Sequence, residues 1–183
     1  FEIGQDSIEP PEPLSLERLQ ESDIRIVSYN TLYTGIFDDY RQDNFKRILK
    51  SLDPDIIALQ EHHNETIADI NYLYYLIETW LGDSEWYISK SYSNNIILSR
   101  FPILQDKSLI SSNRTMCVLL DTEDEIGNNL LVINSHLSCC DNNQGRQEQV
   151  DDFIAVWRDW VSLGEGPFDL EYETPFIHLG DFN

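Results

Sequence analysis

Short apolar, β-rich runs that alternate with segments of helical periodicity constrain the fold most. The runs lie at residues 24–29, 55–60, 86–89, 95–99, 115–121, 130–135 and 175–179. Apolar side chains recur at helical spacing in residues 45–52, 70–81 and about 145–161. Such runs predict buried strands, and the periodic segments predict amphipathic helices. The order strand, helix, strand over residues 24–60 favours a right-handed crossover, although a mixed sheet also fits. The sequence therefore predicts an α/β fold.

Length and composition favour a single ordered domain. The chain has 183 residues, of which 41% are hydrophobic and 11% aromatic. This allows a sizeable core and argues against disorder. Residues 1–23 are acidic and contain Pro10, Pro11 and Pro13, so we expect an N-terminal arm at 1–23 and the domain at 24–183. No apolar run approaches the ~20 residues of a membrane-spanning helix, so no transmembrane segment is predicted.

The charge of the chain limits its partners. Its 33 acidic and 12 basic side chains give a net charge of −21. Such a surface repels polyanions at long range, which disfavours general binding of nucleic acid. A solubilising surface is the simplest explanation. An acidic protein can still act on phosphates if a metal ion supplies positive charge locally.

The cysteines do not form a disulfide framework. Cys139 and Cys140 are neighbours, and a bridge between neighbours is strained. Cys117 lies in a strand predicted to pair with residues 131–134 through a turn at 127–129, which would place it opposite residues near Ser135. We expect free, partly buried thiols. Unpaired cysteines favour a reducing compartment, whereas the acidic arm and a start other than Met favour an exported, periplasmic or secreted protein; the compartment stays open.

Polar residues follow the predicted buried strands at the point where each strand ends. They are Asn30, Glu61, His136 and the pair Asp181 and Asn183. Ligands collect at strand carboxyl ends in open α/β sheets. A carboxylate and an amide oxygen suit Mg²⁺, which keeps several waters for a phosphate. A histidine can donate to a phosphate oxygen or transfer a proton, and an aspartate can orient or deprotonate water.

Each of these residues also has a structural interpretation. Asn30 could satisfy backbone groups at a strand end, and Glu61 could cap the following helix. His136 could be a hydrogen-bonded core histidine, and Asp181 an ordinary turn residue. Their shared placement favours the functional interpretation. His178 alternates within an apolar strand and is predicted to be structural, and the pair at 62–63 lacks the ligand spacing of a zinc site.

The chain resembles the metal-dependent endonuclease/exonuclease/phosphatase superfamily, which includes DNase I-like nucleases, sphingomyelinases and inositol-polyphosphate phosphatases. The matching pieces follow the order of the family and extend from about Asp23 to the last residue. They are residues 26–32, 53–61, 95–102, 132–137 with Arg146-Gln147, and 180–183. The resemblance implies a two-sheet α/β sandwich, DNase I-like, with an active site at one edge.

The resemblance also implies a role for each strand-end residue. Glu61 would be the principal metal ligand, with Asn30 beside it binding metal or phosphate. His136 would contact the scissile phosphate and stabilise its developing charge. Asp181 would position or deprotonate the attacking water, and Asn183 would hold a phosphoryl oxygen. The implied cofactor is Mg²⁺, with Mn²⁺ or Ca²⁺ as alternatives.

Family members continue past the Gly-Asp-Phe-Asn element to a Ser-Asp-His type motif that completes the metal site. We therefore expect the sequence to stop before the last strands of the fold. The intact protein would hydrolyse a phosphoester by metal-assisted water attack, and residues 1–183 alone would be inactive. Arg114 matches a phosphate-contacting arginine of the DNase I-like branch less closely and fits a surface arginine equally well.

The substrate is the open part of this interpretation. The charge favours a small phosphomonoester, a sugar or inositol phosphate, or a lipid headgroup. Two alternatives remain. One is a nuclease of the same family, and the other is a non-catalytic binding domain that retains the fold. The sequence does not predict the oligomeric state.

Overall fold

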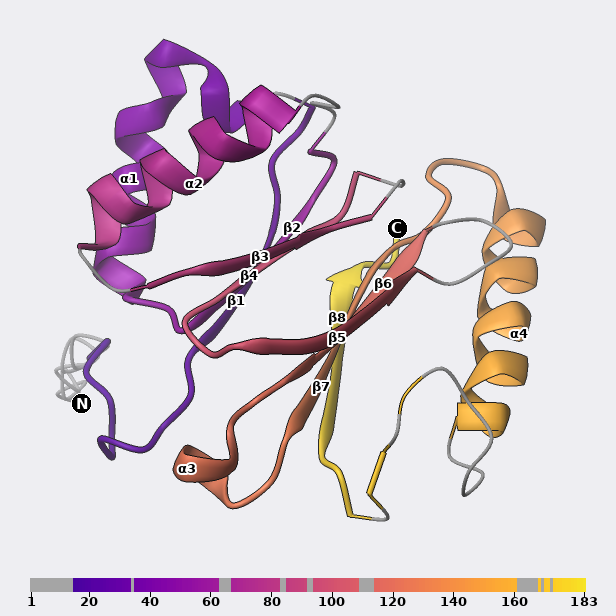
Figure 1. Cartoon of the computed structure of the whole chain (residues 1–183). Helices are drawn as coiled ribbons and strands as arrows, with labels where there is room; N and C mark the ends of the chain where they lie inside the picture. The colour runs from indigo at the N-terminus through magenta and orange to yellow at the C-terminus, as the bar shows by residue number, and fades with distance from the viewer. Residues whose placement is uncertain are drawn as a thin grey trace, which may run out of the picture.

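Two four-stranded sheets pack face to face, and helices cover their outer faces (Figure 1). This computed structural model describes residues 15–33, 35–62, 67–82, 85–91, 94–108, 114–160, 168, 170–171 and 173–183. The prolines of the predicted arm, His63 and the Gly/Pro loop at 164–167 lie outside the described residues. None of the described helices is both long and apolar enough to cross a membrane.

The first sheet has the strand order β1-β2-β4-β3. Its strands are β1 (Ile26–Asn30), β2 (Ile56–Gln60), β3 (Tyr87–Lys90) and β4 (Ile96–Ser99). β1 and β2 are parallel and are joined through the 3-10 helix η1 (Gly35–Phe37) and α1 (Asp39–Leu52). β4 is antiparallel to both β2 and β3. The parallel pair predicted around the first helix is thus confirmed, within a mixed sheet.

The second sheet has the order β5-β6-β7-β8. Its strands are β5 (Ile103–Ser108), β6 (Thr115–Leu120), β7 (Leu130–His136) and β8 (Phe176–Asp181). β7 and β8 are parallel, and the other pairs are antiparallel. The remaining helices are α2 (Ile67–Leu81), α3 (Glu123–Ile126) and α4 (Asn143–Trp160). α1 and α2 cover the first sheet, and α4 covers the second (Figure 1).

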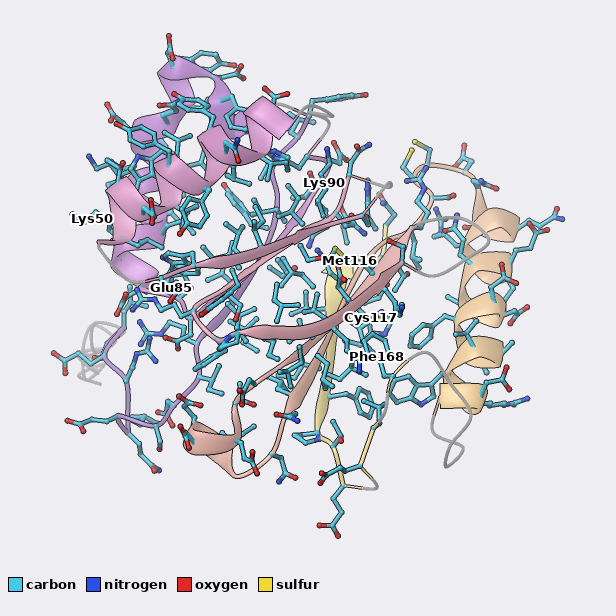
Figure 2. The ribbon with its side chains drawn as sticks, viewed as in Figure 1. Lys50, Glu85, Lys90, Met116, Cys117 and Phe168 are labelled. Carbon is cyan, nitrogen blue, oxygen red and sulfur yellow. The ribbon has the colours of Figure 1, made fainter. Side chains whose placement is uncertain are left out.

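Alternation along the strands separates the core into three layers. On β2, Ile57 and Leu59 pack with α1 and α2, whereas Ile56 and Ala58 pack between the sheets. On β6, Met116 lies between the sheets, and Cys117 points the other way into the layer that contains Phe168 and residues of α4 (Figure 2). Because both faces of these strands are buried, the strands read as continuous apolar runs.

Some local predictions were wrong. Cys117 lies opposite Ile133, and it is Thr115 that lies opposite Ser135. The connection between these strands contains the short helix α3, which ends at Gly127 with φ +74°, and this loop sets a register two residues away from the expected one. Strand β5 was not predicted, and α4 begins at Asn143, slightly earlier than expected.

Residues 15–23 of the predicted arm dock on the domain through Arg18. Its guanidinium donates to both carboxylate oxygens of Asp55, at 2.6 and 3.0 Å, and to the Asp53 carbonyl at 2.9 Å. Such a two-pronged pair fixes direction as well as distance. This clamp lies at the amino end of β2, and the strand-end polar residues lie at the opposite end.

Gly180 permits the close approach of β7 and β8. It lies opposite Ser135 with φ +137°, and a Cβ atom at this position would lie 1.9 Å from the Ser135 carbonyl oxygen. We expect Gly180→Ala to lower the free energy of unfolding by about 3 kcal/mol or more, because backbone must move to relieve the clash.

Urea unfolding would measure this effect, and Gly127→Ala is the matched control. Gly127 also has a positive φ, of +74°, but a Cβ atom there meets nothing within 4 Å. Gly127→Ala should therefore lower the free energy of unfolding by only ~1 kcal/mol. Equal losses in the two variants would show that backbone conformation, and not the contact with Ser135, is the constraint at Gly180.

Candidate active site

Four polar side chains from four strands meet at one edge of the sandwich. The Asn30 Nδ2 group donates to Glu61 Oε1 at 3.0 Å and to Asp181 Oδ2 at 2.8 Å. His136 Nε2 lies 3.5 Å from Glu61 Oε1. The His136 side chain is 9% exposed and that of Glu61 is 20% exposed, so solvent screens their interaction only in part.

Strand register brings these residues together. β1 and β2 are parallel with Asn30 opposite Gln60, and β7 and β8 are parallel with His136 opposite Asp181. Asn30, His136 and Asp181 are the last residues of their strands, and Glu61 directly follows β2. The bond from Asn30 to Asp181 connects the first sheet to the second. The two pairs of carboxyl ends therefore form a single edge.

Backbone amides hold the two central side chains in place. Asn30 Oδ1 accepts a hydrogen bond from Leu32 N at 2.9 Å, and Asp181 Oδ1 accepts one from Asn183 N at 3.0 Å. Each side chain thus uses one atom to form its own turn and another to reach its partner. Glu61 and Asn183 have left-handed backbone, with φ of +56° and +54°. Conformations of this kind concentrate at functional sites in folded proteins.

Partial burial raises the pKa of Asp181, but hydrogen bonds from Asn30 and Asn183 and the nearby His136 lower it by more. The pKa of Asp181 is therefore below its ordinary value, and the carboxylate is ionised at neutral pH. Its role in this state is to accept hydrogen bonds and to attract cations.

A buried network of amide side chains supports the edge from below. Gln60 Nε2 donates to Asn134 Oδ1 at 2.8 Å, across the gap between the sheets. Asn134 Nδ2 donates to the carbonyls of Leu59 and Ile96 at 3.0 and 3.1 Å. Asn95 Nδ2 donates to the Asn134 carbonyl at 3.2 Å. Gln60 directly precedes Glu61 and Asn134 lies close before His136, so the network fixes both strand ends.

Sequence analysis missed this network, although a signal for it exists. Gln60 and Asn134 are uncharged amides within apolar runs, and both are fully buried at 1% and 0% exposure. A buried amide must find hydrogen-bond partners, because leaving one without a partner costs about 1–3 kcal/mol. Such residues in predicted strands therefore indicate contact with another polar group in the core.

The other predicted site residues lie around the cluster. Asn183 Nδ2 donates to the carbonyl of Leu137, at 3.0 Å, directly after His136. The Arg114 carbonyl accepts hydrogen bonds from His136 N at 2.8 Å and Asn95 Nδ2 at 3.0 Å, so its backbone adjoins His136. Contact of either side chain with a phosphate stays a prediction.

The remaining described histidines lie outside the cluster. His178 Nε2 lies 2.8 Å from Ser135 Oγ, and its ring packs on Phe153 with ring centroids 4.7 Å apart. Burial lowers the pKa of His178, so its imidazole is neutral at pH 7. His62 is buried and packs edge-on against Phe37. The surroundings of His178 agree with the structural role that the sequence predicts.

The donor set at the edge fits a hard divalent cation. Mg²⁺ is commonly bound through one or two carboxylates and keeps several waters. Glu61 supplies a carboxylate, and Asn30 Oδ1 has a second lone pair beside the one used by Leu32 N. Within the described ranges, no group of three or more His, Cys, Asp or Glu side chains is placed so that it could hold a metal ion. An open site with few protein ligands is the kind this edge can provide.

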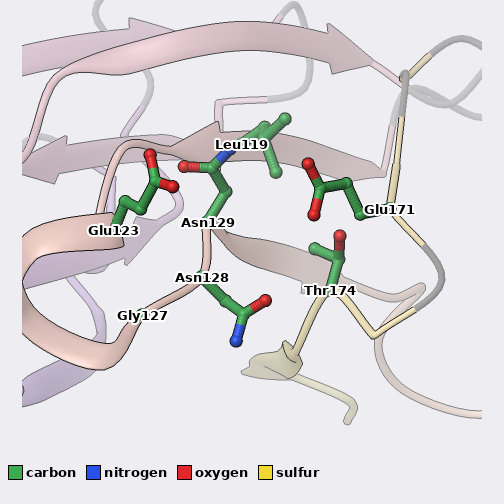
Figure 3. A pocket seen from close by; sticks show the side chains of 7 residues that line it. All are labelled: Leu119, Glu123, Gly127, Asn128, Asn129, Glu171 and Thr174. Carbon is green, nitrogen blue, oxygen red and sulfur yellow. The ribbon is translucent and has the colours of Figure 1, made fainter.

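A separate pocket lies at the other end of the second sheet (Figure 3). It is formed around α3 and the turn that follows it, far along β7 from His136. Its lining includes the carboxylates of Glu123 and Glu171 and the side chains of Asn128, Asn129 and Thr174. The pocket contains none of the predicted site residues, and the chemistry suggested by the sequence lies at the strand-end edge.

The two-sheet sandwich and its acid, amide and imidazole cluster define a protein of the DNase I-like α/β class. The sequence profile of the Endonuclease/Exonuclease/phosphatase family matches residues 27–183, and the chain belongs to this family. Among curated proteins, none matches the chain.

Solved structures with the same fold have low sequence identity to the chain. An endonuclease/exonuclease/phosphatase family protein from Leptotrichia buccalis is 16% identical with a TM-score of 0.59, over 88% of this chain and 67% of its own. The human Nocturnin catalytic domain with bound sulfate anion is 16% identical with a TM-score of 0.60, over 88% and 65%. D. rerio TDP2 complexed with single strand DNA product is 18% identical with a TM-score of 0.57, over 87% and 60%. The chain thus spans about two thirds of the length of these structures or less.

We expect Asn134→Ala to lower the free energy of unfolding by about 3 kcal/mol, because the Leu59 and Ile96 carbonyls lose a donor in the core and Gln60 Nε2 keeps only its longer bonds to Ser28 Oγ and the Ala58 carbonyl. Chemical denaturation would measure the change. The matched control is Asn44→Ala, since Asn44 is exposed on α1 and alanine is a better helix former. A loss at Asn134 no larger than that at Asn44 would contradict the structural importance of the network.

The stability of the protein should also depend on pH through His178. Its pKa is lowered in the folded state, so the unfolded chain binds the proton more readily. Neutral His178 makes its full contribution to the free energy of unfolding above the pKa that it has in the unfolded chain, ~6.5. That contribution is lost as the pH falls through the lower pKa that His178 has in the folded protein. In His178→Gln, which can still bond Ser135, the fall in denaturation midpoint between about pH 7 and pH 5 should be smaller than in wild type. Identical pH profiles would refute this assignment.

Proposed function

We propose that the protein hydrolyses phosphoesters by metal-assisted attack of water at the edge formed by Asn30, Glu61, His136 and Asp181. The observation that carries the proposal is the bridge made by Asn30, whose Nδ2 group holds Glu61 and Asp181 in a single site at 3.0 and 2.8 Å. Two carboxylates in separate sheets are thereby held beside an imidazole. Membership of a family that consists mainly of phosphoesterases and nucleases supports the same conclusion.

Glu61 would hold the metal ion. The Asn30 carboxamide directs Nδ2 at Glu61 and Oδ1 at Leu32 N, so it would have to turn for Oδ1 to join Glu61 as a ligand. Mg²⁺ is the expected ion, and Mn²⁺ or Ca²⁺ are alternatives. When bound, the ion supplies positive charge to a phosphate and lowers the pKa of bound water. In a chain of net charge −21 this local positive charge matters, because the protein otherwise repels an anionic substrate.

The other side chains act on the substrate and the water. His136 points its Nε2 toward Glu61, and an N–H at this position can donate to a phosphate oxygen and stabilise its growing charge. Asp181 has a lowered pKa, and a general base works best with a pKa near the working pH. Asp181 therefore suits orientation of the water more than removal of its proton. Asn183 would donate to a phosphoryl oxygen through its amide.

The substrate class proposed is a small or lipid-linked phosphoester. The excess of acidic side chains opposes a long polyanion such as DNA. Nocturnin was solved with a sulfate anion, which resembles phosphate in shape and charge, and TDP2 with a single strand DNA product. A nuclease is therefore the second candidate. Faster hydrolysis of plasmid DNA than of small phosphoesters, at equal metal, would favour it.

A binding domain without catalysis is the remaining candidate, since a likeness of fold at 16–18% sequence identity does not carry an activity with it. Metal binding separates it from the enzyme. We expect calorimetry to detect Mn²⁺ or Mg²⁺ binding by the wild-type chain and at least a tenfold weaker affinity in Glu61→Gln, because one negative ligand is lost.

The matched control is Glu125→Gln, which removes an equal charge from the exposed surface of α3. Its metal affinity should equal that of the wild type. Unchanged binding in Glu61→Gln would refute the assignment of the metal ligand, and a wild-type chain that binds neither ion would favour the non-catalytic domain. In the full-length protein, Glu61→Gln should also abolish metal-dependent hydrolysis of the phosphoester.

A further inference from the structure

The chain has an exposed pair of adjacent thiols close to the candidate active site. Cys139 and Cys140 are free and exposed, and Cys117 is free but buried. The pair lies in the loop between β7 and α4, which begins directly after His136. Burial raises the pKa of the Cys117 thiol, so this thiol stays protonated and unreactive. The two exposed thiols are therefore the ones available to reagents in solution.

Side chains of α4 hold the backbone on both sides of Cys139. Arg146 Nη1 donates to the carbonyls of Ser138 at 2.8 Å and Cys140 at 2.9 Å. Gln149 accepts a hydrogen bond from Ser138 N at 2.9 Å and donates to Ser138 Oγ at 2.7 Å. The loop is thus a formed structure whose conformation is coupled to the first turns of α4.

Backbone conformation and neighbouring groups both act on Cys140. Cys140 has left-handed backbone with φ +67°, a conformation that costs free energy for a residue other than glycine. A hydrogen bond with the Cys139 thiol raises the pKa of Cys140, and the guanidinium of Arg146 acts in the opposite direction. One peptide bond joins the two residues, so their Cα atoms lie only ~3.8 Å apart, and both thiols are exposed to a reagent in solution.

We propose that Cys139 and Cys140 form a modification site, at which a peroxide oxidises the two thiols to a vicinal disulfide. One thiolate attacks a peroxide oxygen and breaks the O–O bond, which gives a sulfenic acid and releases hydroxide. The neighbouring thiolate then attacks the sulfenic sulfur and displaces its oxygen as water. In total the two thiols lose two electrons and two protons, and hydrogen peroxide is reduced to water. The proposal does not depend on the phosphoesterase function.

The disulfide formed in this way is readily reversed. Adjacent Cα atoms lie ~3.8 Å apart across a trans peptide, whereas ordinary disulfides join Cα atoms about 4.4–6.8 Å apart. The resulting strain makes the bond easy to reduce, as in labile and regulatory disulfides. The new ring contains the Cys139 carbonyl carbon and the peptide bond that follows it, so ring closure changes the backbone torsions between the Ser138 and Cys140 carbonyls that Arg146 holds. Oxidation would therefore loosen the first turn of α4.

The test is intact-mass analysis of the reduced, folded chain after treatment with hydrogen peroxide. We expect a loss of about 2 Da, and after alkylation under denaturing conditions only Cys117 should be modified. Dithiothreitol should restore all three alkylation sites. Peptide mapping should locate the bond within the peptide that contains residues 139 and 140.

Two variants make the result specific. Cys117→Ala should still lose about 2 Da, because the buried thiol takes no part. Cys139→Ser should instead gain oxygen at Cys140 or form a dimer between chains. Addition of oxygen to the wild type without loss of hydrogen, or a bridge that maps to Cys117, would refute the proposal.

Hydrogen exchange would measure the effect on α4. In the oxidised chain the amides of residues 143–147 should exchange faster than in the reduced chain, because the changed backbone disturbs the two-carbonyl contact of Arg146. Reduced Arg146→Lys, which keeps the charge but loses the two-carbonyl contact, should resemble the oxidised wild type. Equal exchange in both redox states of the wild type would contradict the coupling to α4.

Discussion

The arrangement of the two sheets at the candidate active site depends on the hydrogen bond between Gln60 and Asn134. Its two amides are fully buried in a layer formed largely by apolar side chains, where neither can turn to water. Apolar packing alone would tolerate small slides of one sheet over the other, because it has little direction. A buried pair of amides opposes such a slide, because a shift of one sheet would leave hydrogen-bond donors and acceptors without partners. The pair therefore sets the relative position of Glu61 and His136.

The edge itself brings negative charges together in a protein that already has many. Glu61 and Asp181 repel each other, and Asn30 reduces the repulsion by donating to both. Backbone amides at Leu32 and Asn183 add further donors. Hydrogen bonds of this kind lower the pKa of Asp181 and keep it ionised. The same contacts hold the two carboxylates at one edge of the sandwich.

The sequence was sufficient to predict the strand ends and the class of fold. Apolar runs that stop at Asn30, Glu61, His136 and Asp181 mark strand termini, because both faces of β2 and β7 are buried. Strand β5 escaped prediction because it is only partly buried and the polar run from Gln105 to Lys107 interrupts its apolar residues. The bond between Gln60 and Asn134 joins residues 74 positions apart, and no local pattern encodes such a partner. The register of Cys117 depended on the helix α3 inside a connection that reads as a turn.

Gly180 has a consequence for how this site can vary among sequences. Its lack of a side chain lets β8 approach Ser135, and the approach places Asp181 opposite His136. A glycine before the aspartate is therefore a steric condition of the strand pairing, independent of the chemistry proposed for the aspartate. A descendant of this chain could change Asp181, and with it the proposed chemistry, and still fold. Such a descendant would retain Gly180 for as long as β7 and β8 paired in this way. The glycine of the Gly-Asp pair would then remain in sequences that had lost the aspartate.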